Sequence, residues 1–226
     1  MRGVTKEQII KSVLDASFYK GASKISLSDV ASGLGIKKAS LYNHIESRDE
    51  MFANVFDYCE IFLGKLKFIP DDIETVASRY SSQTVLKGIM KRRFRMHQKP
   101  PLLQIYFFTQ SQKYFDIRAQ QIVKAQHERL ALQIKEVLQV LSRCGKGKAD
   151  TSELDAVATW FCAGSEELLC DVMVGMRGDI LAHQEAGGKP FELHGNMPGI
   201  LPDNLPVASE QLEQMGLLVE RFCKLL

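Results

Sequence analysis

Helical periodicity runs through this 226-residue chain, and it constrains the fold more than any other feature. Apolar residues recur every three or four positions in segment after segment, the spacing that gathers them on one face of an α-helix. No segment shows the strict apolar–polar alternation that a half-buried strand needs. We therefore predict an all-α fold.

Start and stop signals divide the chain into about nine to ten helices. Three starts have a hydroxyl residue followed three positions later by an acid or amide, a pattern that satisfies unpaired backbone donors. These capping boxes are Thr5-x-x-Gln8, Ser26-x-x-Asp29 and Ser47-x-x-Glu50. The expected helices span 6–20, 27–34, 38–44, 48–67, 82–98, 102–114, 117–143, a segment opened by Ser152 and ending near 176, and 208–225, with an extra turn at 71–80 and a loop at 186–206.

Composition indicates a soluble globular protein. Its apolar content is 45% and its charged content 25%, both ordinary for that class. No apolar run approaches the roughly 18 residues that a membrane span needs, and no signal-peptide pattern is visible. The five cysteines are scattered and form no C-x-x-C pair, so we expect reduced thiols and a cytoplasmic location.

Charge is unevenly spread, although the net charge is only +2. Residues 1–48 hold eight Lys or Arg and four Asp or Glu, a net of +4. Residues 150–192 hold nine acidic and two basic residues, a net of −7. This asymmetry indicates an N-terminal part that meets polyanions and a C-terminal part that does not.

Residues 26–45 have the layout of a helix-turn-helix, in which a tight turn joins two short helices. Gly35 allows the positive φ that such a turn needs. The apolar contacts between the helices come from Val30, Leu34, Ile36, Leu41 and Ile45. An ordinary helical corner in a bundle would explain these contacts. It would not need the many hydrogen-bonding side chains on the second helix, which favour DNA binding.

The segment Ser26–Met51, SLSDVASGLGIKKASLYNHIESRDEM, resembles the DNA-binding module of TetR family transcriptional regulators. The likeness covers about residues 5–56 and includes the opening Ser, Val-Ala, Gly-Ile and Leu-Tyr-x-His. Ile45, Ala39 and Lys37 replace a usual Phe, a frequent Gly and a frequent Ser, which makes the operator hard to infer from relatives. The resemblance implies a three-helix DNA-binding domain at 1–48 and a larger helical effector-binding and dimerisation domain at 49–226.

The resemblance also implies roles for individual residues. Ser26, Tyr42, His44 and Arg48 are expected to hold DNA phosphates. The candidates for the major groove are Lys37, Lys38, Ala39, Ser40 and Asn43, because lysine can read guanine, asparagine can pair with adenine, and alanine can touch a thymine methyl. The simpler alternatives are a cap-region charge for Lys37 and a bond to its own helix for Ser40.

Two apolar stripes in the C-terminal part are typical of helices that pack along other helices. They comprise Leu154, Val157, Leu168 and Val172 in one helix and Leu212, Met215, Val219 and Phe222 in the last helix. Relatives dimerise through their last two helices, so the resemblance implies a homodimer with these residues at the interface. The alternative is that a stripe forms core within one chain. A twofold dimer would place two recognition helices about 34–36 Å apart on a near-palindromic operator.

A small-molecule effector pocket is likewise implied by the resemblance. Its candidate lining is Met90, Phe94, His97, Tyr106, His127, Trp160 and Phe161, although aromatic residues at helical spacing also form plain core. Lys87, Lys91, Arg95 and Lys99 make an i, i+4 stripe. A solvated face explains that stripe best, and an anionic ligand or an extra DNA contact is the alternative.

Two other classes of protein compete with a DNA-binding regulator. An all-helical enzyme is disfavoured because the chain has no H-E-x-x-H, G-x-S-x-G or phosphate-loop motif, and we predict no catalytic residue, metal or cofactor. A helical protein-interaction module would need only a corner that mimics the helix-turn-helix. The prediction is a homodimeric repressor that binds double-stranded operator DNA, contacts no membrane, and is released by an unidentified small molecule.

Overall fold

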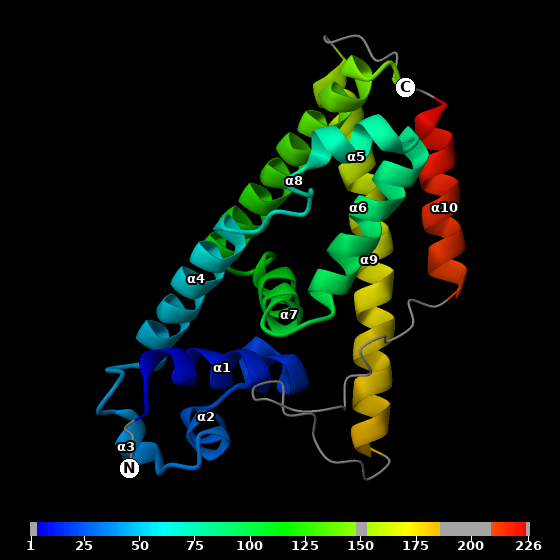
Figure 1. Ribbon diagram of the computed structural model, residues 1–226. Coiled ribbons are helices and arrows are strands. Elements are labelled where there is room, and N and C mark those ends of the chain that lie inside the picture. The colour runs from blue at the N-terminus through cyan, green and yellow to red at the C-terminus, as the bar shows by residue number, and fades with distance from the viewer. Residues whose placement is uncertain (1–3, 148–152, 186–208, 225–226) are drawn as a thin grey trace. The chain divides into compact units, whose positions relative to one another are not determined.

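Helices are the only regular elements in the part of the chain that the computed structural model describes, residues 4–147, 153–185 and 209–224 (Figure 1). This confirms the predicted all-α fold. The elements are α1 (Lys6–Lys20), the 3-10 turn η1 (Ala22–Lys24), α2 (Leu27–Gly33), α3 (Lys38–Leu41), α4 (Arg48–Gly64), α5 (Ile73–Arg79), α6 (Ser82–His97), α7 (Leu102–Gln112), α8 (Ile117–Arg143), α9 (Leu154–Glu185) and α10 (Ser209–Cys223). None of these described helices combines the length and apolar character that a membrane crossing requires.

The predicted helix starts follow from side-chain caps. Thr5 and Ser26 both form complete capping boxes, with Gln8 and Asp29 as the reciprocal partners. Ser47 caps α4 by accepting from the Glu50 amide at 3.1 Å. The Glu50 carboxylate, however, accepts from the backbone N–H of Glu46 rather than from that of Ser47. The third box is therefore half formed, although α4 begins at Arg48 as predicted.

The largest differences from the predicted helix ends are in α3, α4 and α9, and α4 stops at Gly64 rather than near residue 67. The regular part of α3 stops at Leu41, because Asn43 and His44 donate to the carbonyls three residues back and tighten the final turn. By contrast, α9 continues nine residues past the expected end at Met176. Gly175 and Gly178 lie inside this longer helix, where each glycine costs about 1 kcal/mol relative to alanine, and Ile180 just beyond them is buried. Ser152 and the expected loop at 186–206 lie outside the described residues.

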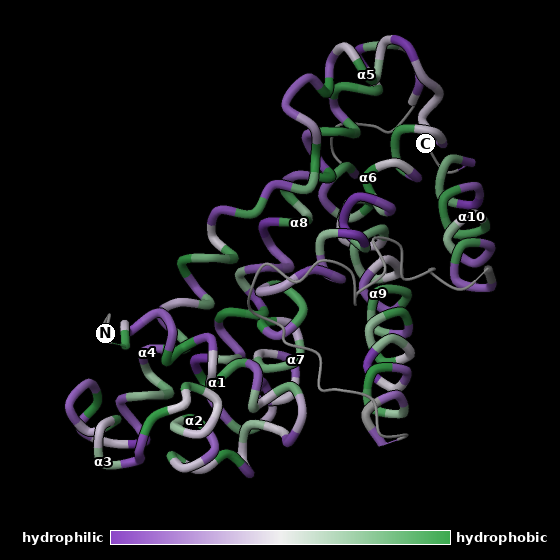
Figure 2. Tube along the Cα trace, turned by 60° about the horizontal axis from the view of Figure 1, so that its bottom comes forward, coloured by the Kyte–Doolittle hydropathy of each residue, from purple (hydrophilic) through white to green (hydrophobic). Residues whose placement is uncertain are grey.

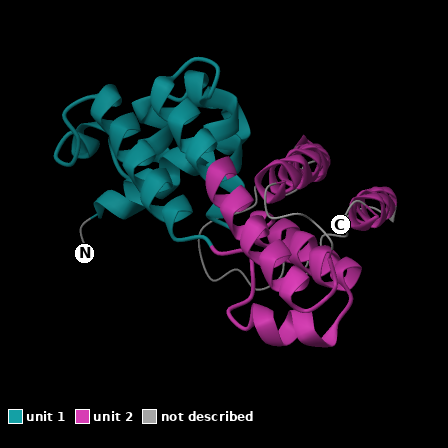
Figure 3. Cartoon of the chain, turned by 90° about the horizontal axis from the view of Figure 1, so that it is seen from above, with its two compact units in different colours: residues 1–66, 99–126, 192–198 teal, residues 67–98, 127–191, 199–226 magenta. Residues whose placement is uncertain are grey.

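One compact unit contains the described residues 4–66 and 99–126 (Figure 3). In this unit α1 packs against α2, α4 and α7. Aromatic rings fill the spaces between these helices, with ring centroids 5.3 Å apart for Phe18 and Phe107 and 5.2 Å apart for Phe56 and Phe108. The helix-turn-helix segment thus shares a compact unit and its core with α4 and α7.

The second unit contains the described residues 67–98, 127–147, 153–185 and 209–224. Here α10 packs against both α6 and α9, and Figure 2 shows apolar and polar residues alternating along α10 as in an amphipathic helix. Phe161 and Phe222 meet at 4.7 Å between ring centroids. Gly164 admits α10 closely, since a Cβ there would lie 3.0 Å from a methyl of Leu218.

Candidate nucleic-acid interface

A tight turn fixes the angle between α2 and α3. Gly35 adopts φ of 65°, a conformation that suits glycine because it has no Cβ. Its amide donates to Ser32 and the amide of Ile36 donates to Ala31, both at 3.0 Å. These two bonds form a Schellman motif that satisfies the last carbonyls of α2. The local sequence therefore builds the turn that was predicted.

Few apolar side chains anchor α3 to its neighbours. Leu41 is 0% and Ile45 2% exposed, and both lie against the core that buried Val30 and Ala31 share. Ser12 of α1 donates from its hydroxyl to the Val30 carbonyl at 3.1 Å. Through this bond α1 holds α2 of the helix-turn-helix in place. The side of α3 that faces away from the core is left to solvent.

The predicted DNA-contacting side chains of α3 lie on that open side. Tyr42 is 50% exposed, and Ser40 is half-buried. The other members of the set are exposed, namely Lys37, Lys38, Ala39, Asn43 and His44. In the described part of the chain, the side chains of Lys38, Asn43 and His44 form no hydrogen bond. The structure thus brings seven of the predicted residues together on one short segment.

Ser26 is exposed at the start of α2, but its hydroxyl is engaged by Asp29. It accepts from the Asp29 amide at 3.2 Å and donates to the carboxylate at 2.7 Å. Lys20, at the end of α1, forms an ion pair with the same carboxylate. The Lys20 ammonium, followed by the hydrogen bonds from Ser26, holds the pKa of Asp29 well below its usual range. Asp29 therefore stays ionised and ties α1 to α2.

Arg48 differs from the other predicted phosphate-holding residues. Its guanidinium donates to the backbone carbonyls of Ile25 at 3.3 Å, Ala22 at 3.4 Å and Ser23 at 3.5 Å. It also lies over the Phe52 ring, 4.6 Å from the centroid. Several of its donors are therefore directed at the protein rather than at solvent.

Most of the predicted dimer-interface side chains are used inside the second unit. Five of the eight are at most 6% exposed, namely Leu154, Val172, Met215, Val219 and Phe222. The physical reason is that α10 has two partners in its own chain, α6 and α9, and they cover its apolar stripe. Val157 and Leu168 are half-buried, and Leu212 is 38% exposed. The outward sides of these helices carry other apolar residues, Trp160, Val174 and Leu217.

The predicted pocket residues do not all lie together. Trp160 is 69% exposed on α9, so it does not line the core. Tyr106 is buried in the first unit, whereas the other five belong to the second. Those five are Met90, Phe94, His97, His127 and Phe161. A cavity of about 390 Å³ opens between α5 and α8; four of its nine lining residues are acidic, and no predicted pocket residue lines it.

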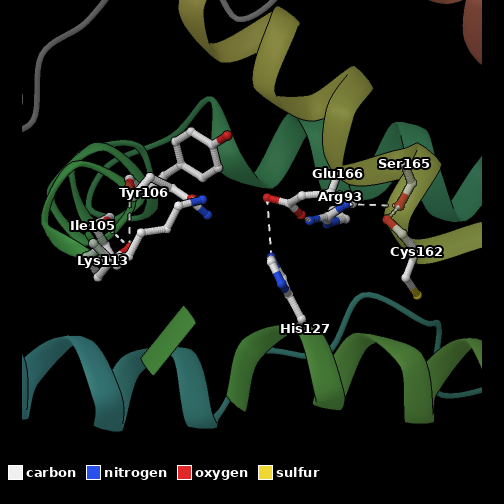
Figure 4. Close-up of polar contacts among 10 residues, drawn as sticks. Arg93, Ile105, Tyr106, Lys113, His127, Cys162, Ser165 and Glu166 are labelled. Atoms are coloured by element: carbon white, nitrogen blue, oxygen red, sulfur yellow. Dashed lines mark hydrogen bonds and ion pairs between the residues drawn. The ribbon is translucent and has the colours of Figure 1, made fainter. Parts of the chain in front are cut away.

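A buried charged cluster in the second unit escaped the sequence analysis. Arg93 of α6 is 2% exposed and pairs with Glu166 of α9. Its guanidinium also donates to the Ser165 hydroxyl at 3.1 Å, and Figure 4 shows His127 of α8 approaching Glu166 from the other side, with Nε2 and Oε1 3.6 Å apart. Arg93 stands at the same four-three-four spacing as Leu86, Met90 and His97. A charge on an apolar stripe was the signal that could have revealed it.

Burial and charge set the protonation of this cluster. Burial, helped by the Arg93 charge, lowers the pKa of His97 to about 3, so the ring is neutral. Its Nδ1–H donates to the Arg93 carbonyl at 2.9 Å. Burial would raise the pKa of Glu166, but the imidazole of His127 and the guanidinium of Arg93 outweigh it and lower that pKa to about 2. Arg93 and Glu166 are thus both charged, and the Arg93 Nε has no hydrogen-bond partner among the described residues.

Solved structures show which fold this is. A TetR-family regulator from Streptomyces coelicolor matches with a TM-score of 0.59 and 14% identity, covering 98% of this chain and 82% of that one. One from Marinobacter aquaeolei matches with a TM-score of 0.57 and 17% identity over 97% and 99%. The regulator PfmR of Thermus thermophilus matches with 0.51 and 14% over 96% and 97%. No protein-family model matches the chain, and no curated protein sequence matches it.

The chain therefore has the fold of the TetR-family transcriptional regulators. This confirms the fold that the resemblance at residues 26–51 implied, and it extends the likeness from about a quarter of the chain to nearly its whole length. The identities of 14% and 17% are too low for the fold to define what this particular chain binds.

Proposed function

We propose that this protein is a sequence-specific DNA-binding transcriptional regulator, a homodimeric repressor that a small molecule releases from a near-palindromic operator. One observation carries the proposal. The polar side chains of residues 37–44 are exposed together on a short helix that Leu41 and Ile45 anchor, within a fold shared with TetR-family regulators. We propose no catalytic activity, metal or cofactor.

The proposed DNA contacts divide into two kinds. Ser26, Tyr42 and His44 hold phosphates and set the position of the protein on the duplex, because most protein–DNA hydrogen bonds go to the backbone. The remaining residues read base edges in the major groove, where each base pair presents its own pattern of donors and acceptors. These readers are Lys37, Lys38, Ala39, Ser40 and Asn43.

The homodimer is proposed to form through the outward sides of α9 and α10. Trp160 and Val174 are 69% and 59% exposed and stand two heptads apart, so they lie on one face of α9. Leu217 of α10 is 51% exposed. Exposed aromatic and aliphatic side chains are the usual anchors of protein interfaces. This face replaces the buried residues of the two apolar stripes as the proposed interface.

Effector release is proposed to involve the cluster of buried Arg93 with the partly exposed Glu166 and His127. A buried ion pair contributes little net stability. The Arg93–Glu166 pair, with His127 of α8 beside it, is therefore better explained as a polar recognition site than as a stabilising contact. A ligand that prefers one conformation weakens DNA binding by the same factor by which DNA weakens ligand binding. If operator affinity is the same with and without every ligand found to bind the protein, release from the operator by a ligand is excluded.

The proposal is tested by selecting bound sequences from a random pool of DNA duplexes. We expect a near-palindromic consensus, because a twofold dimer presents two identical recognition helices. We also expect affinity to fall with salt, with a log–log slope of roughly −0.9 for each phosphate neutralised. A helical protein-interaction module would enrich no sequence and bind no duplex.

A matched control comes from two exposed cations outside the helix-turn-helix, Lys91 and Arg95 of α6. The double variant Lys91→Ala/Arg95→Ala should keep the wild-type salt slope. A smaller salt slope in this variant would instead show that α6 contacts DNA.

A further inference from the structure

Arg48 is the first residue of α4, and its contacts join three parts of the helix-turn-helix unit. The three carbonyls that accept from its guanidinium belong to Ala22, Ser23 and Ile25, which form the turn directly before the N-cap of α2. The cationic group also covers the ring of Phe52, one turn along α4. That ring lies 5.9 Å from the ring of Phe108 in α7.

The shape of the guanidinium explains why arginine suits this place. Its five N–H groups form a rigid planar fork, so one side chain can reach several carbonyls while its face stacks on an aromatic ring. A lysine ammonium carries the same charge but is a compact point donor without a stacking face. The turn otherwise has only two internal bonds, from Lys24 to Gly21 at 3.1 Å and from Ile25 to Ala22 at 3.4 Å.

We propose that Arg48 is a positioning residue, which braces the Ala22–Ile25 turn against the first turn of α4 and so fixes the start of α2 for DNA binding, rather than itself holding a phosphate. This inference rests on the proposed DNA-binding function. The Lys20–Asp29 ion pair is a second contact that holds the same region, since it ties the end of α1 to the first turn of α2.

Two variants separate the brace from a phosphate contact, with the operator recovered by selection as the probe. Arg48→Lys keeps the charge and loses the fork, and Arg48→Ala loses both. We expect both variants to weaken operator binding by roughly tenfold, as befits lost charge-assisted hydrogen bonds. Both variants should keep the wild-type salt slope, because a brace neutralises no phosphate. If Arg48→Lys instead binds like the wild type and Arg48→Ala lowers the slope by about 0.9, Arg48 holds a phosphate and the brace is refuted.

A second measurement works on the free protein. Amide hydrogen exchange at Lys24 and Ile25 should become faster in both variants, because the turn loses its brace. Lys38→Ala is the matched control, since it removes an exposed cation nearby and should leave exchange in the turn unchanged. Unchanged exchange in Arg48→Ala overturns the brace even if operator binding is weakened. Faster exchange in both variants supports it even if the chain selects no DNA, so the two proposals fail independently.

Discussion

At the scale of single residues, exposure separates side chains that face solvent from those that build the module. Leu41 is buried and Tyr42 is half exposed although they are adjacent, because successive residues on a helix point about 100° apart. The tightened turn after Leu41 then brings Asn43 and His44 to the open side. Tyr42, Asn43 and His44 can therefore be changed with little effect on the core.

The residue-scale prediction concerns Asn43 and Tyr42. Asn43→Ala should relax preference at one base position per half-site, by about 1–3 kcal/mol, since a bidentate base contact is lost. Tyr42→Phe should instead weaken binding to all sequences about equally. Repeating the duplex selection with each variant measures both effects. Tyr114→Phe, at an exposed tyrosine of the α7–α8 turn, is the control. A uniform loss from Asn43→Ala would move Asn43 to the backbone-holding set.

At the scale of elements, α9 and α10 each have two different faces. Their inward faces meet each other through Phe161 and Phe222. The outward face of α9 carries Trp160 and Val174, which are 69% and 59% exposed. The same helix can therefore supply core to its own chain and a surface to a second copy.

The element-scale prediction is that Trp160→Glu abolishes the proposed homodimer. Placing a carboxylate at an aromatic anchor leaves an unpaired charge in a desolvated contact, which should cost at least about 2 kcal/mol or roughly 30-fold in affinity. Sedimentation velocity at micromolar concentration measures the change. Leu132→Glu, at a 65% exposed leucine of α8, should remain dimeric. A dimeric Trp160→Glu protein would show that the interface lies elsewhere.

At the scale of the whole molecule, buried ionisable groups tie stability to pH. His97 is fully buried between Phe68, which stacks on it at 5.6 Å, and the backbone of Arg93. Its pKa lies at about 3 in the folded chain and at 6.5 ordinarily. Between these values the unfolded chain binds one more proton than the folded chain, so acidification favours unfolding. The pKa of Glu166 is also lowered, and its contribution is lost only below its ordinary value of 4.5.

The corresponding prediction is a loss of stability well above the pH at which carboxylates titrate. Between pH 6.5 and 5.5 the free energy of unfolding should fall by about 1 kcal/mol, since one full proton difference contributes roughly 1.4 kcal/mol per pH unit. Urea unfolding at pH 7.5, 6.5 and 5.5 measures this. His97→Gln keeps a donor for the Arg93 carbonyl and should flatten the curve. Equal slopes in the two proteins would assign the acid sensitivity to another histidine.

Local signals were enough for most of the fold. The bounds of α1 and α8 were predicted to the residue, because caps, glycine and helical periodicity all lie within the segment itself. The Schellman turn at Gly35 is local in the same sense. The end of α9 was not predicted, because no local signal marks it: Gly175 and Gly178 lie inside the helix, and Ile180 beyond them is buried.

The sequence by itself determined that this protein is all-helical and that residues 37–44 present polar side chains from a helix-turn-helix, since both depend on near neighbours. Tertiary structure alone decided which face of each helix is covered. Periodicity marks a face as apolar but does not name its partner, so Met215 and Val219 proved to be core whereas Trp160 is exposed. The same reason hid Arg93, whose partners Ser165 and Glu166 lie more than 70 residues away and are brought to it only by the packing of α9 against α6.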